Sequence, residues 1–312
     1  MNKLLQIKKD FQTGQIDKAR FIEAMSAEYA YLFSYPEFLK DVNIAEIRIR
    51  HDGIVAEFND PRISLYCPPG DMRSAPFEAL NFNDYEHQEI QAVRRIIFKL
   101  GGSAARFIDI GANVGFYSLA LAHYFPGISG IAFEPIPETY VTLKRNFELN
   151  GVTSVRPLDL GLSDKSGEII FYSYPSLSAA AGMTRILDGP DVKEVRCEVV
   201  RLDDYSQAND VKADFIKCDV EGAELLVFRG AEKLLARDRP AVFAEMLRKW
   251  SAKYDYHPND LIHFFQQLGY GCFIIDGSRL HACPVVTEQT KDTNFIFLHL
   301  EKHAELLADW VD

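Results

Sequence analysis

From residue 106 onward, short apolar runs alternate with longer stretches in which apolar residues recur at helical spacing. The runs have the length of buried strands, and the stretches have the period of amphipathic helices. The predicted strands are residues 106–110, 130–133, 154–160, 215–218, 241–244, 271–275 and 294–298. The predicted helices include residues 115–124, 138–150, 223–237 and 258–268. This alternation predicts a mostly parallel sheet covered by helices, with the last two strands as an antiparallel pair at one edge.

The first 82 residues carry a different pattern. Residues 1–33 have apolar positions at roughly helical spacing, which predicts one or two amphipathic helices. Residues 44–58 alternate apolar and polar side chains around a central aspartate–glycine pair, which is typical of a β-hairpin. We therefore expect an α+β N-terminal extension at residues 1–82 and the main domain at residues 83–312. The extension could cover an acceptor, join two chains in a homodimer or extend the core.

A second hairpin is predicted inside the main domain, because residues 167–174 and 194–202 also alternate. The stretch between them, residues 175–186, is rich in small side chains. It is either a flexible solvated loop or a cover over the acceptor site, since loops of this kind often close over ligands.

Composition narrows the range of partners. Of the 312 residues, 47% are hydrophobic and 25% are charged, as in ordinary soluble proteins. The net charge of −11 disfavours nucleic acid, because binding to phosphates depends on Lys and Arg. We expect no secretory signal and no membrane span, because no apolar run has the required length. The five cysteines form no CxxC pair, which favours reduced thiols and a cytoplasmic location.

The residues with chemical potential follow the predicted strands. Ligands of open α/β sheets bind beyond the carboxyl ends of the strands. The first strand contains Asp109 and leads into a glycine turn at residues 111–115, which lets a ligand approach the main chain. Glu134-Pro135 follow the next strand, where a carboxylate commonly holds a ribose. Together these residues predict a cofactor that contains a nucleoside.

Two features favour S-adenosylmethionine over NAD as that cofactor. A dinucleotide fold uses Gly-x-Gly-x-x-Gly to hold a pyrophosphate, and the turn between Gly111 and Gly115 lacks this triple glycine. The carboxylate of Asp109 would repel a pyrophosphate, whereas it suits the sulfonium and ammonium groups of S-adenosylmethionine.

Three segments together resemble the FkbM family of methyltransferases. They are FIDIGANVGFYSLA at residues 107–120, FEPIP at 133–137 and FIKCDVEGAELLVFRG at 215–230. The block K-x-D-V-E-G-A-E, which starts at Lys217, is the most specific of the three. The resemblance extends over about residues 85–300.

This resemblance implies a Rossmann-like class I methyltransferase fold, with a seven-stranded, mostly parallel sheet and an antiparallel last strand. It also implies S-adenosylmethionine-dependent O-methylation of a hydroxyl on a sugar, a glycan or a secondary metabolite. In the family's pattern, the glycine turn surrounds the methionine part of the cofactor, Glu134 holds the ribose and Ser163-Asp164 lie near the adenine. Glu86 closes over the cofactor. The full predicted cofactor-binding set is Glu86, Asp109, Gly111, Ala112, Asn113, Gly115, Phe116, Tyr117, Glu134, Pro135, Leu162, Ser163, Asp164 and Asp219.

Catalysis needs an acceptor oxygen that is aligned with the methyl group, and a base or a metal ion that activates a weakly nucleophilic hydroxyl. Asp219, Glu221 and Glu245 all follow predicted strands, so their carboxylates are expected to converge. They could hold a divalent cation such as Mg²⁺ or Ca²⁺, or supply one base and two structural acids. Glu221 could instead accept the free N–H groups at a helix start. His257, at the start of the helix after the Glu245 strand, is a further candidate base.

Two classes of function remain. The first is an O-methyltransferase, and the second is a methyltransferase-like module that binds nucleoside without turnover and serves interactions. The intact acids and glycines favour the enzyme. An NAD-dependent oxidoreductase is a third and more distant alternative.

Overall fold

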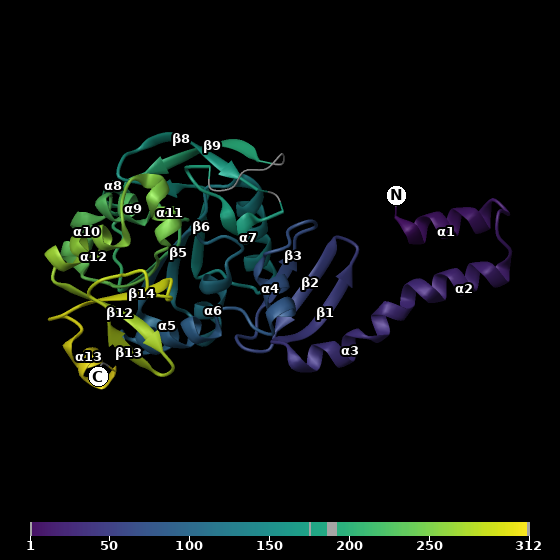
Figure 1. The fold of residues 1–312 in the computed structure, drawn as a ribbon, viewed down its shortest axis with the longest axis horizontal. Helices are drawn as coiled ribbons and strands as arrows, with labels where there is room; N and C mark the ends of the chain where they lie inside the picture. The colour runs from purple at the N-terminus through teal and green to yellow at the C-terminus, as the bar shows by residue number, and fades with distance from the viewer. Residues whose placement is uncertain (1, 175, 186–191, 311–312) are drawn as a thin grey trace.

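The structure is a computed structural model, and it describes residues 2–174, 176–185 and 192–310. Its central sheet has eight strands in the order β13-β12-β14-β11-β10-β4-β5-β6 (Figure 1). These are β4 (Arg106–Ile110), β5 (Ser129–Phe133), β6 (Val155–Leu158), β10 (Phe215–Cys218), β11 (Ala241–Glu245), β12 (Tyr270–Asp276), β13 (Arg279–Ala282) and β14 (Asn294–His299). All seven predicted strands are present, which confirms the α/β class.

The sheet differs from the prediction at one edge. The sequence predicts seven strands, but β13 adds an eighth through a hairpin with β12. β14 lies between β11 and β12 and runs antiparallel to both. The predicted antiparallel pair therefore exists, although β13 forms the edge. β13 has only four residues, too few to show a clear alternation in the sequence.

The order of the parallel strands decides where a site can form. β5 and β6 lie on one side of β4, whereas β10 and β11 lie on the other. The strand order therefore reverses between β4 and β10, and a crevice forms at such a point beyond the carboxyl ends. Lys217 on β10 pairs in register with Asp109 on β4 at this point.

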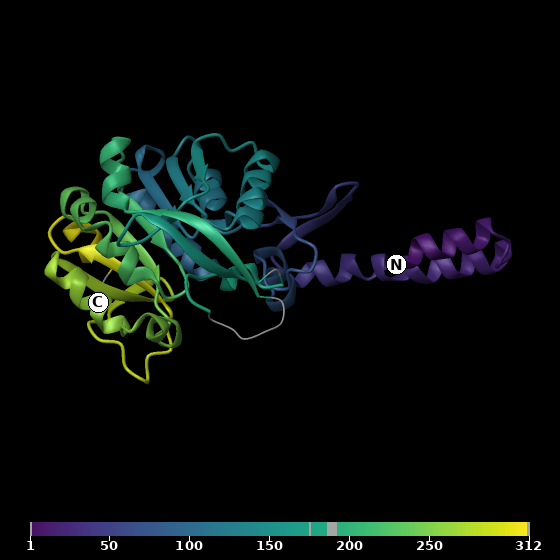
Figure 2. The same ribbon diagram turned by 90° about the horizontal axis from the view of Figure 1, so that it is seen from above.

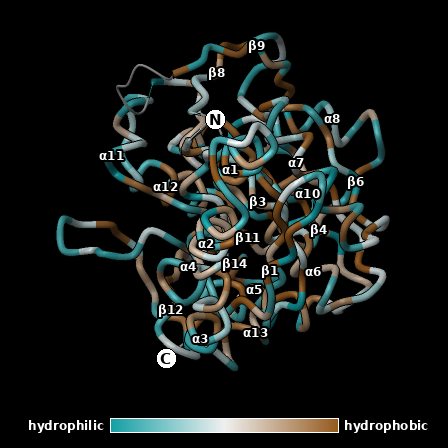
Figure 3. The backbone as a smooth tube through the Cα atoms, turned by 90° about the vertical axis from the view of Figure 1, so that its right-hand side faces the viewer, coloured by the Kyte–Doolittle hydropathy of each residue, from teal (hydrophilic) through white to brown (hydrophobic). Residues whose placement is uncertain are grey.

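Helices cover both faces of the sheet, and each face has its own hydrophobic core. One core includes side chains of α5 (His87–Lys99), α6 (Phe116–Tyr124), α7 (Pro137–Leu149) and α13 (Ala304–Trp310). The other includes α8 (Leu202–Ala208), α9 (Glu224–Arg229), α10 (Glu232–Asp238) and α12 (Pro258–Gln267). The predicted helix at 223–237 is thus two helices. In Figure 3, hydrophobic segments gather in the middle of the view and many outer loops are hydrophilic.

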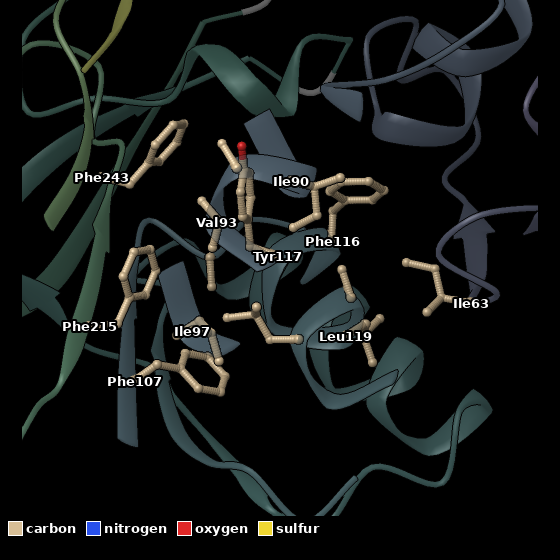
Figure 4. Close-up of a cluster of buried hydrophobic side chains, with 14 of the residues drawn as sticks. Ile63, Ile90, Val93, Ile97, Phe107, Phe116, Tyr117, Leu119, Phe215 and Phe243 are labelled. Carbon is tan, nitrogen blue, oxygen red and sulfur yellow. The ribbon is translucent and has the colours of Figure 1, made fainter. Parts of the chain in front are cut away.

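Residues 42–82 pack onto the first of these faces. β1 (Ile44–Arg50) and β2 (Gly53–Phe58) form the predicted hairpin, followed by β3 (Ser64–Cys67) and α4 (Ala75–Phe82). The rings of Phe58 and Phe116 lie 5.4 Å apart, and Ile63 belongs to the same cluster (Figure 4). The hydrophobic core is therefore continuous across the expected boundary at residue 82.

The edge of β3 is also joined to the main body. The backbone N–H groups of Ser64 and Tyr66 donate to the side-chain oxygens of Asn150 and Asn146, each at 2.8 Å. Both asparagines belong to α7 or its C-terminal end. Side chains thus pair backbone groups that an edge strand would otherwise leave open.

Residues 3–41, which we call the arm, project away from this body (Figures 1 and 2). The arm consists of α1 (Lys3–Gln12), α2 (Lys18–Tyr29), η1 (Ala30–Phe33), α3 (Tyr35–Phe38) and η2 (Leu39–Asp41). The rings of Phe11 and Phe21 stack at 4.5 Å and hold α1 against α2.

The remaining elements are a small second sheet and several short helices. β7 (Gly161–Leu162), β9 (Lys193–Val200) and β8 (Gly167–Ser173) form a small second sheet, which confirms the second hairpin. Short helices are η3 (Gly102–Ala104), η4 (Ser178–Ala180), α11 (Arg248–Ser251) and η5 (Ala252–Tyr254). Among the described residues, we find no helix with the length and apolarity that crossing a bilayer requires.

Candidate active site

A cavity of about 440 Å³ opens at the carboxyl ends of β4, β5, β10 and β11. Its volume is typical of sites for small molecules. It is lined by most of the predicted site residues: Glu86, Gly111, Ala112, Asn113, Phe116, Tyr117, Glu134, Pro135, Asp219, Glu221 and Glu245. The predicted residues outside its wall are Asp109, Gly115, Leu162, Ser163, Asp164 and His257.

The glycine turn after β4 owes its glycines to packing within the chain. Gly111 has a φ of +71°, and a Cβ there would lie 1.9 Å from the carbonyl oxygen of Asp219. Gly115 has a φ of +91°, and its Cβ would lie 2.6 Å from Leu143 Cδ1 on α7. Both glycines thus make room for neighbours within the chain, the end of β10 and α7. Gly111 also lines the cavity, so the close approach of a ligand stays a prediction there.

Glu134 lies buried at the end of β5, with its carboxylate in the cavity wall. It accepts hydrogen bonds from the backbone N–H groups of Asn113 (3.0 Å) and Ile136 (2.9 Å). Burial nevertheless raises the pKa of Glu134 to about 7. Because a carboxylate has about four acceptor positions, two remain for the hydroxyls of a ribose. The position of Glu134 therefore fits its predicted role.

Lys217 is a buried cation between two loops of the site, and its side chain is 6% exposed. Its Nζ donates to the carbonyl oxygen of Gly111 at 3.0 Å and lies 3.4 Å from Asp219 Oδ2. Burial lowers the pKa of Lys217, but the charges of Asp219, Asp109 and Glu86 outweigh it and hold the pKa above its usual value. Sequence reasoning gave Lys217 no role, although a lysine within an apolar strand was a signal.

Asp109 lies beneath the cavity. Its Oδ2 accepts a hydrogen bond from the Ser118 hydroxyl at 2.7 Å, and its Oδ1 lies 3.8 Å from Lys217 Nζ. Burial raises the pKa of Asp109, and Lys217 opposes that rise. We expected Asp109 to attract the cofactor directly, but the structure pairs its charge with Lys217. The carboxylate that faces the cavity at this place is Asp219.

Asp219, Glu221 and Glu245 converge as predicted, and we call them the acid cluster. One oxygen from each lies within 4.8 Å of the others. Burial, followed by the charge of Asp219, raises the pKa of Glu221 to about 9. The same two causes raise the pKa of Glu245 well above its ordinary value. Such a cluster can be neutralised by a proton or by a hard cation with oxygen ligands.

Glu224, rather than Glu221, satisfies the backbone at the start of α9. Its Oε1 accepts from the N–H groups of Val220 and Gly222 at 3.1 Å each. Glu221 instead has a φ of +54°, an uncommon conformation for a residue with a side chain, and it lines the cavity. The structural role considered for Glu221 therefore belongs to Glu224.

His257 is exposed and stands at the start of α12. Its ring Nδ1 accepts a hydrogen bond from the backbone N–H of Asn259 at 3.2 Å, and the backbone N–H of His257 donates to the carboxylate of Asp260. His257 caps a helix away from the cavity wall, so the geometry does not favour it as a base.

A narrow recess of about 20 Å³ adjoins the main cavity. Leu162 lines this recess, and Gly111, Pro135 and Val220 line both spaces. Ser163 is buried next to Leu162, whereas Asp164 is exposed. Neither Ser163 nor Asp164 lines the cavity or the recess, so their place near the adenine stays a prediction.

Residues 176–185 contribute a wall of the cavity through Leu177, Ser178, Ala180 and Ala181. The hydroxyl of Ser178 donates to Asp71 Oδ2 at 2.5 Å and lies 3.4 Å from Asn113 Oδ1. The stretch considered as a cover therefore lies over the glycine turn. The two ends of that stretch, Pro175 and Ile186, lie outside the described residues.

The chain also matches a family model described as "Methyltransferase FkbM domain", over residues 109–272 and thus more than half its length. It is 30% identical over 143 residues to Methyltransferase 1 of Beauveria bassiana (strain ARSEF 2860), covering 40% of the chain and 57% of that protein.

Two further relatives have more specific names. Hexuronic acid methyltransferase AglP of Haloferax volcanii (strain DS2 and its equivalents) is 32% identical over 129 residues, covering 41% of the chain and 50% of that protein. The 31-O-demethyl-FK506 methyltransferase FkbM of Streptomyces tacrolimicus is 28% identical over 152 residues, covering 40% of the chain and 58% of that protein. The chain thus spans between half and three fifths of the length of these three relatives.

Proposed function

The chain belongs to the FkbM methyltransferase family, and on this premise we propose that it methylates a hydroxyl oxygen with S-adenosylmethionine as donor. The proposed acceptor is a sugar, a glycan or a secondary metabolite. The names of two relatives support this range, since one specifies a hexuronic acid and the other an O-demethylated FK506.

The charge of the cavity wall is the observation that carries the choice of cofactor. The carboxylates in the wall are Glu78, Glu86, Glu134, Asp219, Glu221 and Glu245, and the cations are Arg73, Lys217 and Lys249. Burial raises the pKa of several of these carboxylates, so an entering sulfonium or ammonium group favours their charged forms, whereas a pyrophosphate opposes ionisation. This difference supports S-adenosylmethionine over NAD.

S-adenosylmethionine supplies an electrophilic methyl group, so the chain's own task is to hold the acceptor oxygen in line with it. Glu134 would hold the ribose, and the turn at Asn113 the methionine part. Leu247, between β11 and α11, and Trp250, on α11, also line the cavity and offer an apolar surface for the acceptor.

Within the acid cluster, Glu245 is the proposed base. Lys217 compensates the charge of Asp219, whereas Glu221 and Glu245 share a site where both cannot easily ionise. For this role Glu221 keeps the proton that the pair shares, so that Glu245 is the ionised carboxylate. The acceptor hydroxyl gives its proton to this carboxylate as the acceptor oxygen gains the methyl group. A divalent cation is not needed for this transfer, so activity should survive dialysis against EDTA.

Transfer of labelled methyl groups to a panel of sugar nucleotides, glycolipids and polyhydroxylated metabolites tests the proposal. With the acceptor found, Glu245→Gln should lower kcat by about 10²- to 10⁴-fold, the usual contribution of a general base. Its affinity for S-adenosylhomocysteine should stay close to that of the unaltered chain. Glu232→Gln, at an exposed position on α10, is the matched control. Full turnover by Glu245→Gln would rule out the base.

A further inference from the structure

The arm presents a row of large apolar side chains to solvent. Between residues 29 and 38, which we call the aromatic segment, six such side chains are 42–81% exposed. They are Tyr29, Tyr31, Leu32, Phe33, Tyr35 and Phe38. Contiguous exposed apolar surface of this kind marks interaction sites in soluble proteins, and aromatic residues are enriched in interfaces.

The arm has little within its own chain to stabilise it. Its helices α1 and α2 have 10 and 12 residues, a length at which isolated helices are marginal in water. In the five described helices of the arm, Met25 is the one buried side chain. A partner that covers the aromatic segment would therefore stabilise the arm.

The charges of the arm are complementary to one another. α1 carries three lysines and one aspartate, whereas residues 17–41 carry five acidic and three basic side chains. The arm is thus neutral as a whole. α1 has a net charge of +2, and residues 29–41 have a net charge of −1. Ion pairs within the arm already join Lys3 to Glu28 and Lys40 to Glu37, so Lys8, Lys9 and Asp41 carry the excess charge of these two parts. Two copies related by a twofold axis could place α1 of each against residues 29–41 of the other, so that opposite charges meet twice.

The rest of the molecule explains why such a contact would use a projecting element. Because the arm is neutral, the net charge of −11 resides in the body. α2 alone spans about 18 Å, which exceeds a Debye length of about 8 Å at physiological salt. Contact through the arms therefore keeps two acidic bodies apart. The three lysines of α1 are fewer than the roughly four to eight basic residues of a cluster that binds anionic membranes.

From these features we infer that the arm is a homodimerisation element, and that a second copy of this chain covers the aromatic segment. The interface is isologous, with aromatic side chains at its centre and the lysines of α1 facing Glu37 and Asp41 of the other copy.

Sedimentation of the full chain over a range of concentrations tests this inference. We expect a species of twice the chain mass of 35.4 kDa. The double variant Tyr31→Ser/Phe33→Ser should sediment as a monomer with an unchanged melting temperature, because both side chains are exposed and lie outside the core of the body. Phe98→Ser, at a 70% exposed position on α5, is the matched control and should remain dimeric.

Charge reversal separates this pairing from unspecific adhesion. The variants Lys8→Glu/Lys9→Glu and Glu37→Lys/Asp41→Lys should each be mostly monomeric, and a mixture of the two should form a heterodimer. A monomer at every concentration would overturn the inference. A monomer that co-sediments with vesicles of anionic lipid would also overturn it. The inference would fail as well if Phe98→Ser lost the dimer.

Discussion

At the scale of single residues, the site depends on one buried cation among carboxylates. Asp109 is 1% exposed, and its Oδ1 has no hydrogen bond to any residue that the structure describes, so Lys217 is what balances its charge. The same ammonium group holds the glycine turn through Gly111 and faces Asp219. Lys217 therefore joins the glycine turn to the acid cluster.

Replacing Lys217 by methionine should lower the free energy of unfolding by about 3–5 kcal/mol, because it leaves a buried carboxylate without a partner. Urea unfolding measures this effect. Lys217→Met/Asp109→Asn should recover most of the loss, because the buried charge has gone as well. Equal stabilities of Lys217→Met and the unaltered chain would show that the pairing contributes nothing.

At the scale of elements, the loop between β10 and α9 is shaped by the buried Glu224. Burial raises the pKa of Glu224 from its ordinary 4.5 to about 7, and Tyr256 also donates to its carboxylate at 3.1 Å. Because the pKa of Glu224 is higher in the folded state than in the unfolded state, the stability that this difference contributes is fully present below pH 4.5. That stability is lost as the pH rises through 7.

We therefore expect Glu224→Gln to reduce the loss of stability that occurs as the pH rises. Between pH 4.5 and pH above 7, the unaltered chain should lose on the order of 3 kcal/mol relative to this variant. Thermal unfolding at several pH values measures the difference. A constant gap between the two proteins would contradict the raised pKa.

The same loop shows how far the sequence could predict the site. Asp219, Glu221 and Glu245 were found because each ends or follows an apolar strand, and parallel strands end at one edge. The division of roles between Glu221 and Glu224 was not predictable, because it depends on backbone angles in the turn. The role of Lys217 was missed because two of its partners, Gly111 and Asp109, are distant in sequence, although Asp219 is near. Asp109 was expected to face the ligand for the same reason.

At the scale of the whole molecule, the N-terminal 82 residues consist of two different parts. Residues 42–82 share a core with α5 and α6, whereas the arm projects beyond it. The sequence predicted the helices and the hairpin from their periods. It could not show which of them pack on the body, because apolar spacing is the same for a core face and an interface.

Two truncations should separate these parts. A chain that begins at Leu39 should keep its melting temperature, because it loses the projecting helices of the arm and keeps Leu39, which packs against the core. A chain that begins at Asn83 exposes Phe116 and its neighbours, so we expect insolubility or a much lower melting temperature. Equal stability of both truncated chains would contradict the shared core.

The central claim is that the cavity at the strand ends holds S-adenosylmethionine. Calorimetric titration of the full chain with S-adenosylhomocysteine, and separately with NAD, tests it most directly. The structure predicts saturable binding of S-adenosylhomocysteine at one site per chain and no binding of NAD. Binding of NAD without binding of S-adenosylhomocysteine would contradict the account.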